Sequence, residues 1–368
     1  MKIKNGLVFS ADHTMKSRDL CFENGVITEN SLDGEYDATD CYVLPGFIDT
    51  HIHGAGGVEF YECEYSGDLK KSLDYLTKCG VTSILVTLAT EQYEEYVIDC
   101  QKIVKAADDR VLGIHCEGPF VNPVRKGGLR PSALKSPDKS LIALLQEHSG
   151  GMLKILTIAP EVEGAKDVID ECVKQGVKVS MGHTDCSFEQ GQEGIEWGVS
   201  RSTHTYNAMR PYNHRDPGPI GCALTDDRID CELICDLHHV SAPAIKLAVK
   251  AKGVDKITMI SDTSFFCGVP EGTYPFGERE LIVKGGFARL PDGTISGSAC
   301  PLSVGAKNMF DLGYTPAEIA VMASVNPARA ADATDRGELM EGYRADVIIL
   351  DKDFNVKDVF LKGELVAK

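Results

Sequence analysis

The order of hydrophobic and polar positions changes along the chain and separates its two ends from its middle. Near each end, short alternating runs are separated by turn residues, as in 19–27 and 345–366. Alternation predicts strands with one buried face, and an Asn-Gly pair after such a run predicts a hairpin. Neither end is long enough to build a core alone. We therefore expect residues 1–45 and 330–368 to pair into one small β-sandwich domain.

In the middle of the chain, continuous apolar runs alternate with helical patterns. Buried parallel strands have such continuous runs. Eight are present: Val43–His53, Thr82–Leu88, Val111–Glu117, Leu153–Ala159, Lys178–His183, Ser200–His204, Glu232–His239 and Lys256–Asp262. The helical patterns are Ser66–Cys79, Glu91–Ala107, Asp138–His148, Ala165–Gln175, Ser187–Trp197 and Ala242–Lys252, with more helix after Pro301. Eight such units predict an α/β fold, a (β/α)8 TIM-like barrel over residues 46–329.

The connection between the sixth and seventh predicted strands is long. It runs from Asn207 to Arg228 and is rich in proline and glycine. Barrel active sites lie at the carboxyl ends of the strands, and loops of this length in compact domains are usually functional. We expect this loop to belong to the site.

Composition excludes several classes of protein. Hydrophobic residues make up 43% of the 368 residues and charged residues 25%, which is ordinary for a globular protein. The net charge of −17 argues against a nucleic-acid partner, because such proteins are basic. Apolar segments are too short for a membrane span or a signal peptide, and the 13 cysteines are scattered without a C-x-x-C pair. We expect a cytoplasmic protein with free thiols and no membrane partner.

Residues that can bind a metal end five of the eight predicted strands. They are His51 and His53 on the first strand, Glu117 on the third, His183 on the fifth, His204 on the sixth and Asp262 on the eighth. Two residues two positions apart on a strand point the same way, so both first-strand histidines face one side. Imidazoles and carboxylates that meet at one barrel face indicate a metal site.

The chemistry of these side chains predicts their roles. Glu117, His183 and His204 supply one carboxylate and two neutral imidazoles, a ligand set that leaves room for water in hydrolytic zinc sites. His51 and His53 are placed to hold a second ion, with Glu117 as the bridge. We therefore expect one or two divalent ions, zinc or iron.

Asp262 is the candidate general base. A carboxylate within hydrogen-bond reach of an activated water can take its proton and later return it to a leaving nitrogen. A ligating or supporting role is the alternative for this residue. His115 has the same strand parity as Glu117 and is expected on the core side or in support of the site.

Several motifs resemble the amidohydrolase superfamily. The run Leu44–Gly54 resembles its opening strand, and Gly337–Asp351 resembles its returning β-domain segment. Four shorter motifs are similar to those of the N-acetylglucosamine-6-phosphate deacetylase family: Glu117–Phe120, Gly182–Thr184, Ser202–Met209 and Asp292–Ser298. The resemblance covers nearly the whole chain in order.

The resemblance implies a metal-dependent homodimeric hydrolase that converts N-acetylglucosamine 6-phosphate to glucosamine 6-phosphate and acetate. By position it implies metal ligands at Glu117, His183 and His204, catalysis by Asp262, and substrate contacts from Asn207, Ala208, Arg215 and His239. In the family, the arginine reaches the phosphate bound by the neighbouring subunit. Such an acidic chain needs a local positive patch for a phosphate, from Arg215 and His239 together with Lys126, Arg130 or Arg210. Some family members replace the second histidine of the first motif and hold one ion, so keeping both favours a second ion.

One departure from the family pattern bears on the substrate. The family has a substrate-contacting histidine shortly after Glu-Gly-Pro, where this chain has Leu129 within Lys126–Arg130. The sugar therefore stays open, and N-acetylgalactosamine 6-phosphate is an alternative substrate.

Two broader alternatives are an amidohydrolase for cyclic amides, nucleobases or non-phosphorylated N-acyl compounds, and a metal-free scaffold. Many members of the first class carry a carboxylated lysine at the end of the fourth strand, but here Lys154 begins that strand. A scaffold should have lost ligands or the base, and this chain keeps both.

Overall fold

The computed structural model describes residues 1–31, 34–60, 68–89, 92–276 and 279–367. The predicted helix starts at Ser66 and Glu91, and the thiol of Cys63, lie outside the described residues. At the centre is an eight-stranded parallel sheet. Its strands, in spatial order, are β8 (Phe47–Ile52), β11 (Val81–Leu88), β12 (Val111–Glu117), β13 (Leu153–Ile158), β14 (Lys178–Met181), β15 (Val199–Ser202), β16 (Asp230–Ile234) and β17 (Ile257–Ile260). The first and last strands meet where the Asp262 N–H donates to the His51 carbonyl at 2.9 Å.

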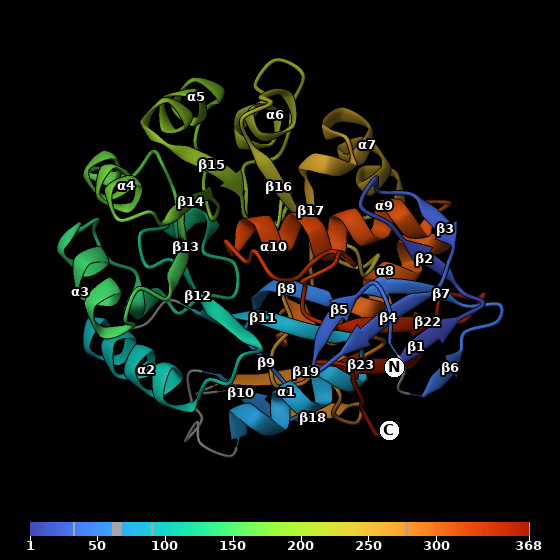
Figure 1. Cartoon of the computed structure of the whole chain (residues 1–368). Coiled ribbons are helices and arrows are strands. Elements are labelled where there is room, and N and C mark those ends of the chain that lie inside the picture. The colour runs from blue at the N-terminus through green and yellow to red at the C-terminus, as the bar shows by residue number, and fades with distance from the viewer. Residues whose placement is uncertain (32–33, 61–67, 90–91, 277–278, 368) are drawn as a thin grey trace.

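A helix follows each strand of this sheet, and the helices lie around its outside (Figure 1). They are α1 (Asp68–Lys78), α2 (Tyr93–Ala106), α3 (Ser140–His148), α4 (Ala165–Lys174), α5 (Phe188–Trp197), α6 (Gly218–Thr225), α7 (Ala242–Lys252) and α8 (Leu302–Asp311). The predicted (β/α)8 barrel is confirmed. The connection at 207–228 is not all loop, because α6 forms within it and buries Ile220, Cys222 and Ala223.

A further helical segment covers the amino ends of the strands. It consists of α9 (Pro316–Ala320), a π-helical turn over Val321–Val325 and α10 (Asn326–Ala330). The Asn326 amide donates to the carbonyls of Val254 and Ile257 at 2.8 and 2.6 Å, at the beginning of β17. This segment leaves the opposite, carboxyl end of the barrel as the open end.

The open end carries additional small elements. A hairpin of β9 (Gly54–Ala55) and β10 (Val58–Glu59) follows β8, and two 3-10 turns, η1 (Pro123–Arg125) and η2 (Pro131–Ala133), follow β12; a third, η3 (Val254–Lys256), precedes β17 at the opposite end. An antiparallel sheet is inserted between β17 and α8: β18 (Gly272–Phe276), β19 (Arg279–Lys284), β20 (Phe287–Arg289) and β21 (Ile295–Ser298). The sequence pattern did not predict this inserted sheet, which packs on its own small core around Phe266 and Leu281.

The two chain ends form two further sheets that lie together at one side of the barrel (Figure 1). One has the order β5 (Val26–Thr28), β4 (Leu20–Glu23), β1 (Lys2–Lys4), β6 (Glu35–Asp37). The other has the order β24 (Glu364–Leu365), β23 (Val356–Leu361), β22 (Val347–Leu350), β7 (Tyr42–Pro45), β2 (Leu7–Phe9), β3 (Met15–Ser17). Phe360 of the second sheet packs edge-on against Phe22 and Tyr36 of the first, with ring centroids 5.4 and 5.3 Å apart. The predicted β-sandwich of both termini is confirmed.

The 12 cysteines within the described ranges are free thiols, most of them buried, as expected. Among the described helices, none has the length and apolar character that crossing a membrane requires.

Candidate active site

Three of the predicted site residues share a left-handed backbone conformation at the open end of the barrel. His183, His204 and Asp262 each come two residues after the end of their strand, with φ of 48°, 29° and 49°. Residues other than glycine rarely adopt this left-handed region, and such strain is concentrated at functional sites. The strands were predicted to run through these residues, and they end earlier because the left-handed turn breaks the ladder. The seventh strand also ends earlier than predicted, at Ile234 rather than His239.

Glu117, His183 and His204 converge on one point. Glu117 Oε1 lies 2.9 Å from His183 Nε2 and 3.0 Å from His204 Nε2, and the two nitrogens are 3.0 Å apart. All three side chains are buried. A single position about 2.0–2.2 Å from all three atoms is geometrically possible, as Zn²⁺ bonds require. We call this set the three-ligand group, and its donors fit a divalent ion.

His183 is oriented so that its Nε2 is unprotonated and free to bind a metal. Its Nδ1 lies 2.9 Å from the Arg125 carbonyl, which can only accept, so Nδ1 carries the proton and Nε2 presents a lone pair. Such backbone partners fix the tautomer and orientation of metal-binding histidines. The loop after β12 thus orients a side chain that follows β14.

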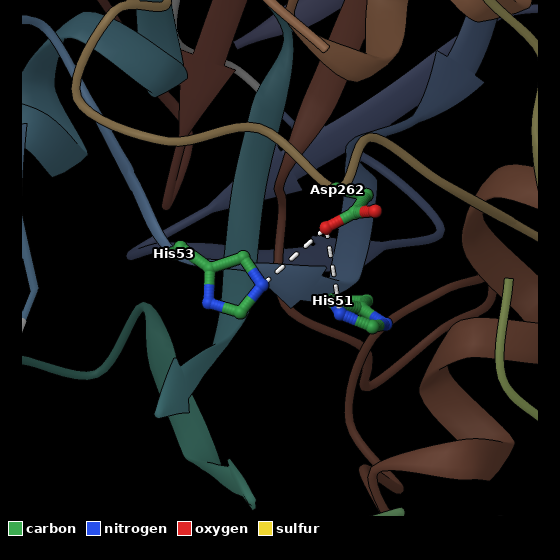
Figure 2. A group of neighbouring side chains, drawn as sticks. All are labelled: His51, His53 and Asp262. Atoms are coloured by element: carbon green, nitrogen blue, oxygen red, sulfur yellow. Dashed lines mark ion pairs between the residues drawn. The ribbon is translucent and has the colours of Figure 1, made fainter. Parts of the chain in front are cut away.

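A second set of donors lies beside the first. His53 Nε2 and His51 Nε2 are 3.3 and 3.6 Å from Asp262 Oδ1, and all three side chains point toward one another (Figure 2). His51, His53 and Asp262 form a possible metal group, which we call the first-strand group. Glu117 lies between the two groups, because its Oε1 is 3.5 Å from His51 Nε2 and its Oε2 is 3.4 Å from His53 Nε2. This is the place that a bridging carboxylate needs.

The electrostatics of the cluster favour positive charge at its centre. Burial disfavours ionisation of Glu117, but the facing His183 and His204 outweigh it and hold its pKa well below the usual range. Burial likewise opposes ionisation of Asp262, and the neighbouring His51 and His53 lower its pKa to about 2. Burial also opposes protonation of His53, yet Asp262 and Glu117 raise its pKa to about 10. A cluster that stabilises both carboxylates and attracts protons to its imidazoles also suits a divalent cation.

The donors open into a cavity of about 280 Å³. Its lining includes Asn207, Ala208 and His239 beside His53, Glu117, His183, His204 and Asp262. The other walls come from Gly127–Leu129, from Thr294–Gly297 of the inserted sheet, and from Glu59, Ala89, Ser264 and Phe266. The structure therefore brings together the sequence-predicted site residues with one exception. Arg215 is exposed on the 207–228 connection and is not among the described residues that line this cavity.

The basic side chains near the cavity differ in the partners that they already have and in whether they line the cavity. His239 Nδ1 is 2.7 Å from Asp236 Oδ2; burial opposes its protonation, but Asp236 outweighs burial and raises the His239 pKa. Arg210 is paired with Asp216, and Lys126 Nζ donates to the Gly127 carbonyl at 3.2 Å. Among the cationic candidates named from the sequence, His239 is the one that lines the cavity.

His115 supports the site from below, as its strand parity predicted. Its Nδ1 donates to the Thr50 carbonyl at 3.0 Å, and its Nε2 lies 2.9 Å from Thr157 Oγ1. Burial and the neighbouring His51 lower its pKa to about 3, so the ring is neutral. Both nitrogens are engaged away from the cavity, and His115 belongs to neither of the two donor groups that face it, although it forms a third, fully buried group with His51 and Glu232.

Sequence reasoning missed two carboxylates of the site. Glu232 lies in the barrel interior beneath His51, and its side chain is fully buried. Glu59 lines the cavity and accepts hydrogen bonds from Ser264 Oγ and, at 3.2 Å, from the Phe265 N–H. A signal exists for Glu232, since a charged residue within the apolar run of β16 is unusual in a buried strand.

Comparison with known proteins identifies relatives over the whole chain. The model of the amidohydrolase family matches residues 42–366. The chain is 33% identical to the N-acetylglucosamine-6-phosphate deacetylase of Lysinibacillus sphaericus, over 99% of this chain and 97% of that protein. It is 31% identical to the N-acetylgalactosamine-6-phosphate deacetylase of Escherichia coli O157:H7, over 96% and 99%. Its structure is similar to that of a mutant N-acetyl-D-glucosamine-6-phosphate deacetylase from Mycobacterium smegmatis in complex with N-acetyl-D-glucosamine-6-phosphate, with a TM-score of 0.93, 27% identity and coverage of 100% and 99%.

Proposed function

Because this chain belongs to the amidohydrolase family, we propose that it hydrolyses the N-acetyl group of N-acetylglucosamine 6-phosphate, giving glucosamine 6-phosphate and acetate. The observation that carries the proposal is the convergence of Glu117, His183 and His204 at 2.9–3.0 Å, with Asp262 facing the same cavity. The sequence relative and the substrate complex described above support the choice of substrate.

The cofactor in this proposal is zinc or iron. Glu117, His183 and His204 would hold a first ion, and His51 and His53, together with Glu117, would hold a second. When bound, the metal supplies Lewis acidity that polarises the amide carbonyl and makes water acidic near neutral pH. The histidines supply neutral nitrogens, which suit either metal.

Asp262 moves the proton in this reaction. Its carboxylate accepts a proton from the attacking water as the new carbon–oxygen bond forms. As the carbon–nitrogen bond breaks, Asp262 returns that proton to the departing amine, and acetate is released. A low pKa keeps Asp262 ionised at neutral pH, so its carboxylate oxygens carry no proton before the reaction begins.

The remaining lining residues bind the sugar phosphate. Asn207 and Ala208 contact the sugar, and His239, whose pKa the neighbouring Asp236 raises against the effect of burial, contributes to phosphate binding. Arg215 lies outside the cavity of its own chain and serves the phosphate in the second subunit of a homodimer. The protein acts in the cytoplasm.

A substrate panel tests this function. The metal-loaded protein should release acetate fastest from N-acetylglucosamine 6-phosphate and more slowly from N-acetylgalactosamine 6-phosphate and unphosphorylated N-acetylglucosamine. The Escherichia coli relative makes the galacto substrate the second candidate, and a preference for it would change the assigned substrate. Turnover of a cyclic amide instead of either sugar phosphate would overturn the proposal.

A further inference from the structure

One buried carboxylate contacts both parts of the donor cluster from below. Glu232 Oε2 lies 3.1 Å from His51 Nδ1 and 3.3 Å from the backbone nitrogen of His204. His51 belongs to the first-strand group and His204 to the three-ligand group. Glu232 is on β16, a strand that contributes no donor to either group, and its side chain is shielded from solvent.

The other oxygen of Glu232 faces a buried cation. Arg201 Nη2 lies 3.5 Å from Glu232 Oε1, and the Arg201 side chain is 2% exposed. The inside of a barrel of this kind is usually filled with branched apolar side chains. An arginine there requires a partner, because an unpaired buried charge is strongly destabilising. The guanidinium therefore sets the orientation of Glu232, with one oxygen toward Arg201 and the other toward His51.

This orientation determines which nitrogen of His51 is available. A carboxylate can only accept, so the His51 nitrogen that faces Glu232, Nδ1, carries a proton. His51 Nε2 then presents its lone pair to the cluster, where it lies 3.5 Å from Glu117 Oε1 and 3.6 Å from Asp262 Oδ1. The opposite tautomer would point an N–H at the metal position and could not bind an ion.

From these contacts we propose that Glu232, oriented by Arg201, is a positioning residue that holds His51 in its metal-binding tautomer and anchors the His204 backbone. The inference rests on the proposed metal-dependent function. It assigns a role to a residue that does not touch the cavity and acts through His51. Partners of metal-binding histidines change metal affinity by about 10–100-fold when they are removed.

The substitution Glu232→Gln should change the tautomer of His51, because an amide has one side that accepts hydrogen bonds and one that donates them. Arg201 attracts the amide oxygen, so the amide NH₂ is turned toward His51 Nδ1. That contact favours a bare Nδ1 and a protonated Nε2, which is the wrong tautomer for metal binding. Removing the cation as well, in Arg201→Met/Glu232→Gln, frees the amide to turn its oxygen back to His51. The double variant leaves Asp230, the other carboxylate near Arg201, with a cationic partner, because Lys256 Nζ lies 3.0 Å from Asp230 Oδ1.

The experiment titrates chelator-treated protein with Zn²⁺ alone, in competition with a chromophoric chelator. The wild type should bind two ions, and Glu232→Gln should bind the ion held by His51 about 10–100-fold more weakly. The double variant should recover most of that loss. Thr157→Val is the matched control, because it removes buried hydrogen bonds to His115 and Thr203 in the same layer, and the Thr157 hydroxyl bonds to neither Glu232 nor His51.

A ¹⁵N spectrum of the zinc-loaded, ¹⁵N-histidine-labelled wild type gives an independent reading without any variant at Glu232. The His51 signals, assigned by their loss in His51→Gln, should show a protonated Nδ1 and a zinc-bound Nε2. Zinc bound through Nδ1 would overturn the inference, as would unchanged zinc affinity in Glu232→Gln. A double variant that binds zinc no better than Glu232→Gln would also overturn it, since a merely structural role predicts no rescue. If the wild type binds zinc as expected but releases no acetate, the proposed function fails instead.

Discussion

The backbone N–H of Asp262 donates to the carbonyl of His51 at 2.9 Å, and this bond joins the last strand of the barrel to the first. The same closure places Asp262 Oδ1 3.6 Å from His51 Nε2. Residues 211 positions apart in the sequence thereby become neighbours at the open end of the barrel. The candidate base reaches the metal donors because the barrel closes.

The role of Asp262 can be tested with an isosteric substitution. Asp262→Asn keeps the shape but removes the proton acceptor, so kcat should fall by about 10² or more. The zinc bound by Glu117, His183 and His204 should remain. Steady-state acetate release and elemental analysis of the same preparation measure both quantities. Near-normal turnover would show that another group accepts the proton.

The positions of the ions can be located directly. Crystals soaked in Zn²⁺ should show anomalous scattering at the zinc edge within about 2.0–2.2 Å of Glu117 Oε1, His183 Nε2 and His204 Nε2. A second peak should lie beside His51 and His53. Anomalous density away from these five side chains would contradict the assigned ligands.

Phosphate recognition should depend on Arg215. A planar guanidinium can hold two phosphate oxygens at once, and the net charge of −17 makes close donors necessary for an anionic substrate. Arg215→Ala should raise KM for the 6-phosphorylated sugar far more than it lowers kcat, whereas the unphosphorylated sugar should be nearly unaffected.

Paired KM measurements, with the oligomeric state checked by light scattering, distinguish the outcomes of this substitution. Equal losses for both sugars indicate a folding or dimerisation defect. Unchanged kinetics for both remove Arg215 from the site.

The contact between the two terminal sheets should be important for stability. Phe360 is fully buried between Phe22 and Tyr36, so Phe360→Ala should cost about 3–5 kcal/mol of unfolding free energy. Leu365→Ala, on a neighbouring strand but 53% exposed, is the control and should change stability little. Denaturant unfolding measures both variants, and equal effects would contradict the importance of this contact.

Much of the site could be predicted because its donors are marked locally in the sequence. His53, Glu117 and Asp262 each end an apolar run, and the barrel brings the ends of its strands to one face. The left-handed backbone of His183, His204 and Asp262 could not be read from that pattern, which is why the predicted strands continued through all three residues. The helix at 218–225 was missed because its glycines and proline are typical of loops.

Other features depend on contacts between distant segments. The inserted sheet over 272–298 has short strands whose pattern is weak, and its role as a cavity wall depends on packing above β17. Glu232 meets His51 across 181 residues of sequence, so no local motif connects them. The exposed position of Arg215 likewise emerges from the path of its loop.

The most direct test of the account is acetate release from N-acetylglucosamine 6-phosphate before and after metal removal. We predict that chelation abolishes acetate release and that stoichiometric Zn²⁺ or Fe²⁺ restores the rate to that of the untreated protein. The same addition should not restore acetate release by Glu117→Gln. Release that persists in protein verified to be metal-free, or a Glu117→Gln variant that works as well as the wild type, would contradict the metal-dependent deacetylase described here.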